Sequence, residues 1–299
     1  MSIKVELSGG IGNQLFQYSA GIFLQEISSI QVDFIIPINE SRKVKNLSSL
    51  REFKFKGRFL VESKKQNWNK MSFTRFNRFV LRNSNYYRLF MKKVKLIYQS
   101  PEIGFDSEFA LIRDELRIVG YFQTHLYASE IKENLVAEFK LHHQSESYIE
   151  LEKEILRITP IVIHIRRGDY LKHKNSIGLL SYEYFFKAIQ EARKLNPSAE
   201  LWVFSDDEVS CERILGKLPF EFKKRIYPSM SISPEEALKL MSFGTGIILS
   251  NSTYSWWAAY LSESANFVIA PAKWLRNLDD PKHLIPNEWI LIESSWDLN

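Results

Sequence analysis

The sequence has 299 residues, of which 45% are hydrophobic and 14% aromatic, so it can form one large domain or two domains of about 100–150 residues. Charged residues make up 25% of the chain and no long low-complexity tract is present, which excludes an intrinsically disordered protein. The single cysteine, Cys211, excludes an internal disulfide and a cysteine-based zinc site, and the formal net charge of +5 is spread unevenly.

The first predicted element is a strand at residues 3–7 (IKVEL), followed by a glycine turn at 9–14 (GGIGNQ) and a helix-like apolar pattern. Glycine lets the backbone approach a ligand closely, so this turn could form part of a binding site. It is not the dinucleotide-binding fingerprint, because Leu15 stands where the third glycine of that motif would fall. Taken alone, a glycine turn between a strand and a helix is an ordinary structural feature.

A strongly basic segment follows at residues 42–95. It contains seventeen lysines and arginines against two acids, Glu52 and Glu62, so it carries +15 and the rest of the chain carries −10. Ten aromatic residues are interleaved with these charges. The pattern predicts an anionic partner, either an anionic membrane surface or a nucleic acid, and a solvated basic face without a partner is the remaining alternative.

Four further apolar runs predict strands, at residues 161–165, 201–204, 246–249 and 267–270, and helical patterns alternate with them. This alternation predicts an α/β protein whose parallel sheets are covered on both faces, with ligands bound beyond the carboxyl ends of the strands. A charged helix-like stretch and Pro160 precede the second half. We therefore expect domains at 1–157 and 158–299, with the last residues able to pack back on the first domain.

Two adjacent arginines, Arg166 and Arg167, end the predicted strand at 161–165. The guanidinium fork matches the oxygens of a diphosphate, and two such groups are costly to bury without an anion. When a sugar leaves a nucleoside diphosphate, negative charge grows on the β-phosphate, and a fixed arginine stabilises that charge. The structural alternative is an ion pair with Asp169.

Two adjacent acids, Asp206 and Asp207, follow the predicted strand at 201–204. A carboxylate can accept two parallel hydrogen bonds from the N1–H and the exocyclic amine of guanine. A magnesium site built through a substrate phosphate is a second functional alternative, and capping of the following helix is the structural one.

A run of polar side chains at residues 250–255 (SNSTYS) opens another predicted helix. The start of a helix offers unpaired N–H groups and the positive end of a dipole, and both suit a phosphate. A single capping residue would satisfy the structure, so the excess indicates a ligand, although a capping cluster remains the alternative.

These clusters, in this order, resemble the α-1,2-fucosyltransferases of glycosyltransferase family 11. The resemblance extends over nearly the whole chain except the basic segment 42–95, and its departures, Ile11 and Ser19, touch no polar contact. The matching pieces are residues 9–18 (GGIGNQLFQY), 120–123 (GYFQ), 164–170 (HIRRGDY), 204–207 (FSDD), 250–259 (SNSTYSWWAA) and 268–271 (VIAP).

The resemblance implies a GT-B fold, in which two Rossmann-like domains face each other across a cleft. The first expected domain, 1–157, which contains the basic segment 42–95, would be the acceptor side, and the second, 158–299, the GDP-sugar-binding domain. It implies an inverting, metal-independent transfer of L-fucose from GDP-β-L-fucose to the 2-hydroxyl of a galactose-terminated glycan, with no cofactor besides this donor. Arg166 would hold the β-phosphate, and His164 with one of the two acids would address guanine. The expected donor-binding set is Gly10, Gly12, Asn13, Gln14, His164, Arg166, Arg167, Asp206, Asp207, Asn251, Ser252, Thr253 and Ser255, and no metal ligands are expected.

Inversion also requires a group that takes the proton of the acceptor hydroxyl. His173 and Asp169 are close in sequence to Arg166, so the expected catalytic set is Arg166, Asp169 and His173. Glu6 and the leaving phosphate itself are further alternatives.

Residues 1–4 run directly into a strand and lack the apolar core of a signal peptide, which predicts a cytoplasmic protein. We expect a bacterial enzyme of surface polysaccharide or oligosaccharide synthesis whose segment 42–95 contacts the anionic inner membrane, where the acceptor is lipid-linked. A transferase with another GDP-sugar or linkage is the alternative within this class. A nucleic-acid-binding protein would leave the paired arginines unexplained, so no nucleic-acid partner is expected.

Overall fold

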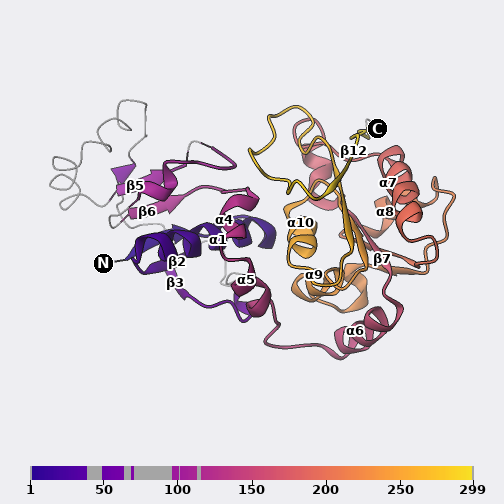
Figure 1. The fold of residues 1–299 in the computed structure, drawn as a ribbon, viewed down its shortest axis with the longest axis horizontal. Coiled ribbons are helices and arrows are strands. Elements are labelled where there is room, and N and C mark those ends of the chain that lie inside the picture. The colour runs from indigo at the N-terminus through magenta and orange to yellow at the C-terminus, as the bar shows by residue number, and fades with distance from the viewer. Residues whose placement is uncertain are drawn as a thin grey trace. The chain divides into compact units, whose positions relative to one another are not determined.

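A computed structural model describes residues 2–38, 49–63, 69–70, 96–100, 102–112 and 116–297. The chain forms two compact units, coloured mainly indigo to magenta and mainly rose to yellow (Figure 1). Unit 1 comprises Met1–Arg51, Phe55–Glu138 and Pro281–Leu284, and unit 2 comprises Glu52–Lys54, Phe139–Asp280 and Ile285–Asn299.

The division after Glu138 comes earlier than the boundary expected after residue 157. Helix α6 (Glu146–Ile158) therefore belongs to unit 2, and the backbone N–H of Ser145 at its start donates to Glu236 Oε1 at 2.6 Å. The piece of the C-terminal half that joins unit 1 is Pro281–Leu284, whereas the last residues stay with unit 2.

Unit 1 contains a six-stranded sheet in the order β3-β2-β1-β6-β5-β4, and all of its neighbouring strands are parallel. In β1 the apolar Ile3 and Val5 are fully buried, whereas the alternate Lys4 and Glu6 face a network of charged side chains. The elements are β1 Ile3–Glu6, α1 Ile11–Ser28, β2 Val32–Ile38, a 3₁₀ turn Ser49–Glu52, β3 Arg58–Ser63, β4 Asn69–Lys70, β5 Leu96–Gln99, a 3₁₀ turn Phe109–Leu111, β6 Leu116–Val119, α4 His125–Ser129 and α5 Lys132–Glu138.

Unit 2 contains a second parallel sheet in the order β12-β11-β10-β7-β8-β9. Helices α7 and α8 cover one face of it, and α9 and α10 cover the other (Figure 1). After α6 the elements are β7 Ile161–Ile165, a 3₁₀ turn Gly168–His173, α7 Tyr182–Leu195, β8 Leu201–Ser205, α8 Glu208–Leu215, β9 Lys224–Ile226, a 3₁₀ turn Pro228–Met230, α9 Pro234–Met241, β10 Gly246–Ile248, α10 Thr253–Tyr260, β11 Phe267–Pro271 and β12 Ile290–Ile292.

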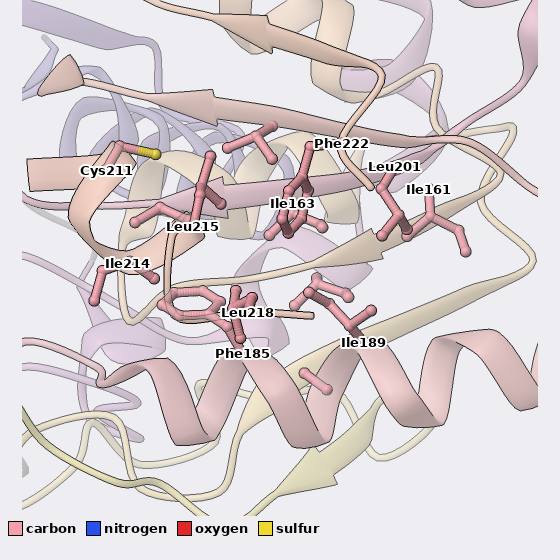
Figure 2. Close-up of a cluster of buried hydrophobic side chains, with 14 of the residues drawn as sticks. Ile161, Ile163, Phe185, Ile189, Leu201, Cys211, Ile214, Leu215, Leu218 and Phe222 are labelled. Carbon is pink, nitrogen blue, oxygen red and sulfur yellow. The ribbon is translucent and has the colours of Figure 1, made fainter. Parts of the chain in front are cut away.

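The predicted strands are confirmed, because β1, β7, β8, β10 and β11 coincide with the five apolar runs to within one residue at either end. Alternate residues of β7 and β8 pack with α7 and α8 in the core of unit 2 (Figure 2). Cys211 lies inside this core, fully buried, and burial raises the pKa of its thiol to about 11. The thiol is therefore a packing group at neutral pH.

The strand order of unit 2 reverses between β7 and β10. The strand that follows β7 (β8) lies on one side of the pair and the strand that follows β10 (β11) lies on the other, so the loops after β7 and β10 diverge and leave room at the carboxyl edge of the sheet. In doubly wound sheets ligands bind at such a reversal, so a binding site is expected at this edge of unit 2.

The basic segment 42–95 lies largely outside the described residues, which include only 49–63 and 69–70 of it. The expected contact with an anionic membrane therefore stays a prediction. Within the described ranges, every helix is too short or too polar to cross a bilayer.

Candidate functional site

The loops after β7 and β10 are joined by side-chain contacts at the strand reversal of unit 2. His164 Nδ1, near the end of β7, lies 2.8 Å from Ser250 Oγ, after β10. Tyr170 continues the connection, since its hydroxyl donates to the backbone oxygen of Asn251 at 3.2 Å. Arg166 lies over the ring of Tyr170, with Cζ 5.3 Å from the ring centroid. The structure thus brings two of the predicted polar clusters together.

Of the two adjacent arginines, Arg166 is the one that solvent reaches, since its side chain is 24% exposed. Nη2 donates to Asp169 Oδ1 at 2.6 Å, and Nη1 lies 3.1 Å from Asp206 Oδ2. The ion pair with Asp169, considered above as the structural alternative, is therefore present. Asp169 is 62% exposed, and ion pairs at such positions contribute about 0–1 kcal/mol, so an incoming phosphate can displace this carboxylate at small cost.

Arg166 also carries an orphaned donor. Its Nε is buried and has no hydrogen-bond partner among the described residues. A buried N–H without a partner costs about 1–3 kcal/mol, and such groups are rare unless a ligand or water completes them. This donor is consistent with an oxygen-rich anion bound beside Arg166.

Arg167 has a different environment, because both of its terminal nitrogens have protein partners, although its Nε, like that of Arg166, is buried without a hydrogen-bond partner among the described residues. Its side chain is 2% exposed, Nη2 donates to the Leu180 carbonyl at 2.6 Å, and Nη1 donates to Asp297 Oδ2 at 3.2 Å. Burial lowers the pKa of its guanidinium, and the charge of Asp297 partly opposes this shift. The two adjacent arginines therefore divide: Arg166 is accessible, and Arg167 fastens its loop to the end of the chain.

Asp206 shapes the arginine loop and Asp207 caps a helix. Asp206 Oδ1 accepts from the backbone N–H of Arg167 at 2.8 Å, and its other oxygen meets Arg166. A Cβ at Gly168 would strike Asp206 Oδ2, so a larger residue here would push this carboxylate away from the arginine loop. Asp207 Oδ1 accepts from the Ser210 N–H at 2.8 Å at the start of α8, as the capping alternative predicted. A contact of either acid with guanine stays a prediction.

The polar run 250–255 is used mainly inside the protein. Asn251 is 1% exposed, and its Nδ2 donates to the carbonyls of Ile177, Gly178 and Trp274 at 3.1–3.3 Å. Ser252 caps α10, and Ser255, fully buried, donates to the Ser252 carbonyl at 3.2 Å. Ser252 therefore fits the capping alternative, whereas Asn251 fastens loops outside the helix, and a contact of these residues or of Thr253 with the donor stays a prediction. What remains for an anion is the N-terminal end of α10 itself.

His164 is neutral in the folded protein. Burial, assisted by the positive charge of Arg166, lowers its pKa to about 3, and only 2% of the residue is exposed. Its ring lies 5.5 Å from that of Tyr254. With so little exposed surface, His164 acts on the site by positioning Ser250, and its expected contact with guanine stays a prediction.

The titration of His164 makes a pH-dependent contribution to stability. The unfolded chain takes up a proton on this imidazole below about pH 6.5 and the folded chain does not, so acid favours unfolding. The contribution is complete above pH 6.5 and is lost towards pH 3, by about 1.4 kcal/mol per pH unit. Urea unfolding of wild type and His164→Asn between pH 7.5 and 4.5 should show a steeper acid loss for the wild type. Equal slopes would contradict a buried neutral imidazole.

The expected catalytic bases differ in their surroundings. His173 is exposed at the end of the 3₁₀ turn Gly168–His173, and no described carboxylate orients its imidazole. Asp169 is engaged with Arg166. Glu6, in unit 1, accepts two hydrogen bonds from Arg117 on Oε2, at 3.0 and 2.8 Å. None of these contacts selects a base, so the assignment stays a prediction.

The four remaining donor-binding residues lie in unit 1, around the start of α1. Gly10 is the N-cap residue, Gly12 is buried in the first turn, Asn13 Oδ1 accepts from Gln123 Nε2 at 3.0 Å, and Gln14 Nε2 donates to the Gly9 carbonyl at 3.0 Å. Two positioning residues, Gln17 and Gln123, were not among the expected site residues. Both belong to the matching pieces at 9–18 and 120–123, so the family resemblance could have identified them as residues that position the glycine turn.

Gly10 is a position where structure and ligand binding can be separated. Its φ of −74° and ψ of 171° are open to alanine, and an added Cβ would meet nothing within 4 Å. We expect Gly10→Ala to change the free energy of unfolding by no more than about 1 kcal/mol, and to raise the donor KM about tenfold if the donor approaches this backbone. Gly9→Ala is the contrast, because Gly9 has φ +76° and its Cβ would strike Asn13. An unchanged donor KM for Gly10→Ala would make the turn purely structural.

Relatives of this chain are glycosyltransferases. Over 311 residues, covering 98% of this chain and 100% of the relative, it is 26% identical to an alpha-1,2-colitosyltransferase of Escherichia coli. Over 309 residues, covering 95% and 98%, it is 26% identical to the O-antigen biosynthesis glycosyltransferase WbnK of Escherichia coli.

The solved structure of POFUT1 in complex with GDP-fucose resembles this chain with a TM-score of 0.51 at 12% identity, covering 90% of this chain and 97% of that chain. At this identity the similarity concerns the fold alone. With the two parallel sheets it confirms the α/β, GT-B fold class that the family resemblance implied. The sequence model of the family described as Glycosyl transferase family 11 matches residues 2–293. The chain therefore belongs to glycosyl transferase family 11 and is a glycosyltransferase.

Proposed function

We propose that the protein transfers L-fucose from GDP-β-L-fucose to the 2-hydroxyl of a galactose-terminated glycan, with inversion, during synthesis of a bacterial surface polysaccharide or oligosaccharide. Two observations about relatives support the linkage and the setting: one is named an alpha-1,2-colitosyltransferase, and the other an O-antigen biosynthesis glycosyltransferase. The donor rests on the family resemblance and on the site of unit 2.

The observation that carries the proposal is the state of Arg166. Its side chain is 24% exposed and stands at the strand reversal, close to the start of α10, whereas Arg167, whose Nε is likewise buried without a described partner, is only 2% exposed. A diphosphate placed there would meet a cationic fork and the positive end of a helix.

The chemistry follows from that placement. The acceptor oxygen forms a bond to the anomeric carbon as the bond from that carbon to the β-phosphate oxygen breaks, and the acceptor proton passes to a base. The departing GDP gains negative charge, which Arg166 stabilises more strongly in the transition state than in the ground state. In this proposal the arginine performs the role that a metal ion performs in other transferases, so chelators leave the rate unchanged.

A second donor is favoured by one observation, the colitosyl transfer named for a relative that aligns over 98% of this chain. Colitose is L-fucose without its 3-hydroxyl. A site that binds that hydroxyl discriminates strongly against the deoxy sugar, because its polar groups are then left unpaired, whereas an apolar site accepts both.

The test is transfer by the purified full chain with GDP-fucose, GDP-colitose, GDP-mannose and UDP-galactose, each with a panel of galactosides, followed by linkage analysis by NMR. We expect a product from GDP-fucose with an α-1,2 linkage, at equal rates with and without EDTA. A product from GDP-colitose alone would move the donor assignment to the deoxy sugar. Transfer from UDP-galactose alone, or a rate that EDTA abolishes, would contradict the proposal.

We further infer that the acceptor is lipid-linked and that the enzyme works at the cytoplasmic face of the inner membrane, where the strongly basic segment 42–95 would meet anionic lipid. Flotation with liposomes that contain 30% anionic lipid should retain the protein, and neutral liposomes should not. Equal behaviour would remove the membrane proposal. A gel-shift titration serves as the counter-test, since salt-dependent binding of nucleic acid would favour the other anionic partner.

A further inference from the structure

Unit 1 contains a pocket of about 280 Å³ beyond the carboxyl ends of β1, β5 and β6. β1, β6 and β5 are neighbours in this parallel sheet, so the pocket lies at the edge where ligands bind in parallel α/β sheets, beyond the carboxyl ends of the strands. The side chains that give it chemical character are Ser8, Gln99, Ser100, Glu102, Ile103 and Tyr121.

The walls of the pocket are held by backbone contacts between two loops. The N–H of Ser100 donates to the Val119 carbonyl at 3.0 Å, and the N–H of Gln123 donates to the Ile103 carbonyl at 2.7 Å. Gly120 allows this close approach, because an added Cβ would lie 2.8 Å from the ring of Phe122 and 3.0 Å from the Cβ of Ser100. The loops therefore form a defined cavity.

The pocket is also fastened to the glycine turn that the donor-binding set includes. Gln17, fully buried, donates to the Gly120 carbonyl at 2.9 Å and to Ser8 Oγ at 3.0 Å, and accepts from the Ser8 N–H at 2.8 Å. Gln123 reaches Asn13 on the other side of the turn. A molecule in the pocket would consequently lie next to residues 9–14.

The size and charge of the pocket select the class of ligand. Sites for drug-sized ligands have about 300–1,000 Å³, so this one suits a single sugar ring and is too small for a nucleoside diphosphate. Glu102 is the one charged side chain among the described residues that line it, and its carboxylate would repel a phosphate. Tyr121 and Ile103, 45% and 44% exposed, offer apolar surface beside hydroxyl and amide groups.

We propose that this pocket binds the terminal, uncharged pyranose of the acceptor glycan. Sugar hydroxyls donate to the Glu102 carboxylate and exchange hydrogen bonds with Gln99 and the serines, while the C–H face of the ring packs on Tyr121. That the bound sugar belongs to the acceptor rests on the proposed function. Binding of a neutral sugar in this pocket can be tested without a donor.

Glu102 has a second partner that the test must separate from sugar binding. Its Oε2 lies 3.3 Å from Lys282 Nζ, and Lys282 belongs to the strap Pro281–Leu284 that joins unit 1. Lys282→Ala removes this ion pair but leaves the carboxylate in place, whereas Glu102→Gln removes the charge and keeps the shape. Only the second change is expected to weaken sugar binding.

The experiment is saturation-transfer difference NMR of the full chain with methyl pyranosides of galactose, glucose, mannose and N-acetylglucosamine, and with inorganic phosphate as competitor. We expect at least one pyranoside to bind, Tyr121→Ala and Glu102→Gln to weaken it at least tenfold, and Lys282→Ala and the surface control Leu111→Ala, 61% exposed, to bind as the wild type does. In transfer assays the two pocket variants should raise the acceptor KM tenfold and leave the donor KM and donor hydrolysis within twofold.

Absence of binding by every pyranoside, equal binding by all variants, or displacement of the sugar by phosphate would overturn the proposal. Sugar binding that depends on Tyr121 in a protein that uses no GDP-sugar would leave the pocket assignment intact and refute the donor. Donor hydrolysis with an acceptor KM that is insensitive to both pocket variants would leave the donor assignment intact and refute the pocket assignment.

Discussion

Replacing Arg166 by alanine is expected to lower kcat by about 10²–10³-fold and to leave the protein folded. The guanidinium sits at the strand reversal of unit 2 with one displaceable ion-pair partner, Asp169, and one unsatisfied N–H, so its removal takes charge stabilisation away from the departing diphosphate. Arg166→Lys should recover only part of the rate, because a point charge cannot reproduce the two-point contact of the fork. Transfer kinetics with GDP-fucose measure this, with urea unfolding as the check on folding.

The matched control for this prediction is Arg225→Ala. Arg225 also pairs with a carboxylate, Glu212, at 3.0 Å and is 41% exposed, but it lies on β9, away from the strand reversal. Its loss should leave kcat within twofold. If Arg166→Ala stays folded and keeps near-normal turnover, the phosphate role of Arg166 is wrong and its contacts with Asp169 and Asp206 are purely structural.

Asp169→Asn then distinguishes two roles of that carboxylate. As a displaceable partner of Arg166, its loss should change kcat only a few-fold, since the amide still accepts a hydrogen bond. As the base, its loss should lower kcat by about 10²–10⁴-fold and remove the acid limb of the pH–rate profile. The same comparison with His173→Asn completes the assignment.

The sheets were predictable from sequence because their strands are continuous apolar runs ended by polar residues. Residues 161–165 form β7 as expected, all five of them buried. The edge that carries the site followed from the same pattern, since polar clusters could lie only where the strands end. The contact between His164 and Ser250 realises that expectation, across 86 residues of sequence.

The uses of individual polar side chains were not predictable in the same way. Asn251 reads as a phosphate ligand from its neighbours, yet its amide joins carbonyls of Ile177, Gly178 and Trp274, which are 23 to 74 residues away. Both carboxylate oxygens of Asp206 likewise contact the arginine loop, one at the Arg167 N–H and the other at the Arg166 guanidinium. Spacing along one helix or strand identifies a polar group, whereas its partner depends on which loops the sheet order brings together.

The domain boundary failed to follow from sequence for a related reason. The charged helix-like stretch before Pro160 was expected to end the first domain. Helix α6 is amphipathic, however, and its Tyr148, Leu151 and Ile155 are buried. Its apolar stripe and the bond from Ser145 to Glu236 place it with unit 2. The charge of the exposed face concealed this packing.

Arg167→Met is expected to lower the free energy of unfolding of unit 2 by about 2–4 kcal/mol, because it removes the buried hydrogen bond to the Leu180 carbonyl and the ion pair with Asp297. Methionine retains most of the buried volume, so the loss reports the polar contacts. Six of the seven tryptophans belong to unit 2, so urea unfolding followed by tryptophan fluorescence measures this unit. Arg213→Ala, an exposed arginine on α8, is the surface control and should stay within about 0.5 kcal/mol.

The double variant with Asp297→Asn tests how much of the loss comes from the charge of Asp297. Removing both charges should restore part of the lost stability, because the negative charge of Asp297 then no longer faces an apolar side chain at position 167. Under conditions where it is folded, Arg167→Met should keep measurable turnover, in contrast to Arg166→Ala. An Arg167→Met protein as stable as the wild type but inactive would transfer the phosphate role to Arg167. The two neighbouring arginines would then have to exchange the parts that their exposures, 24% and 2%, assign to them.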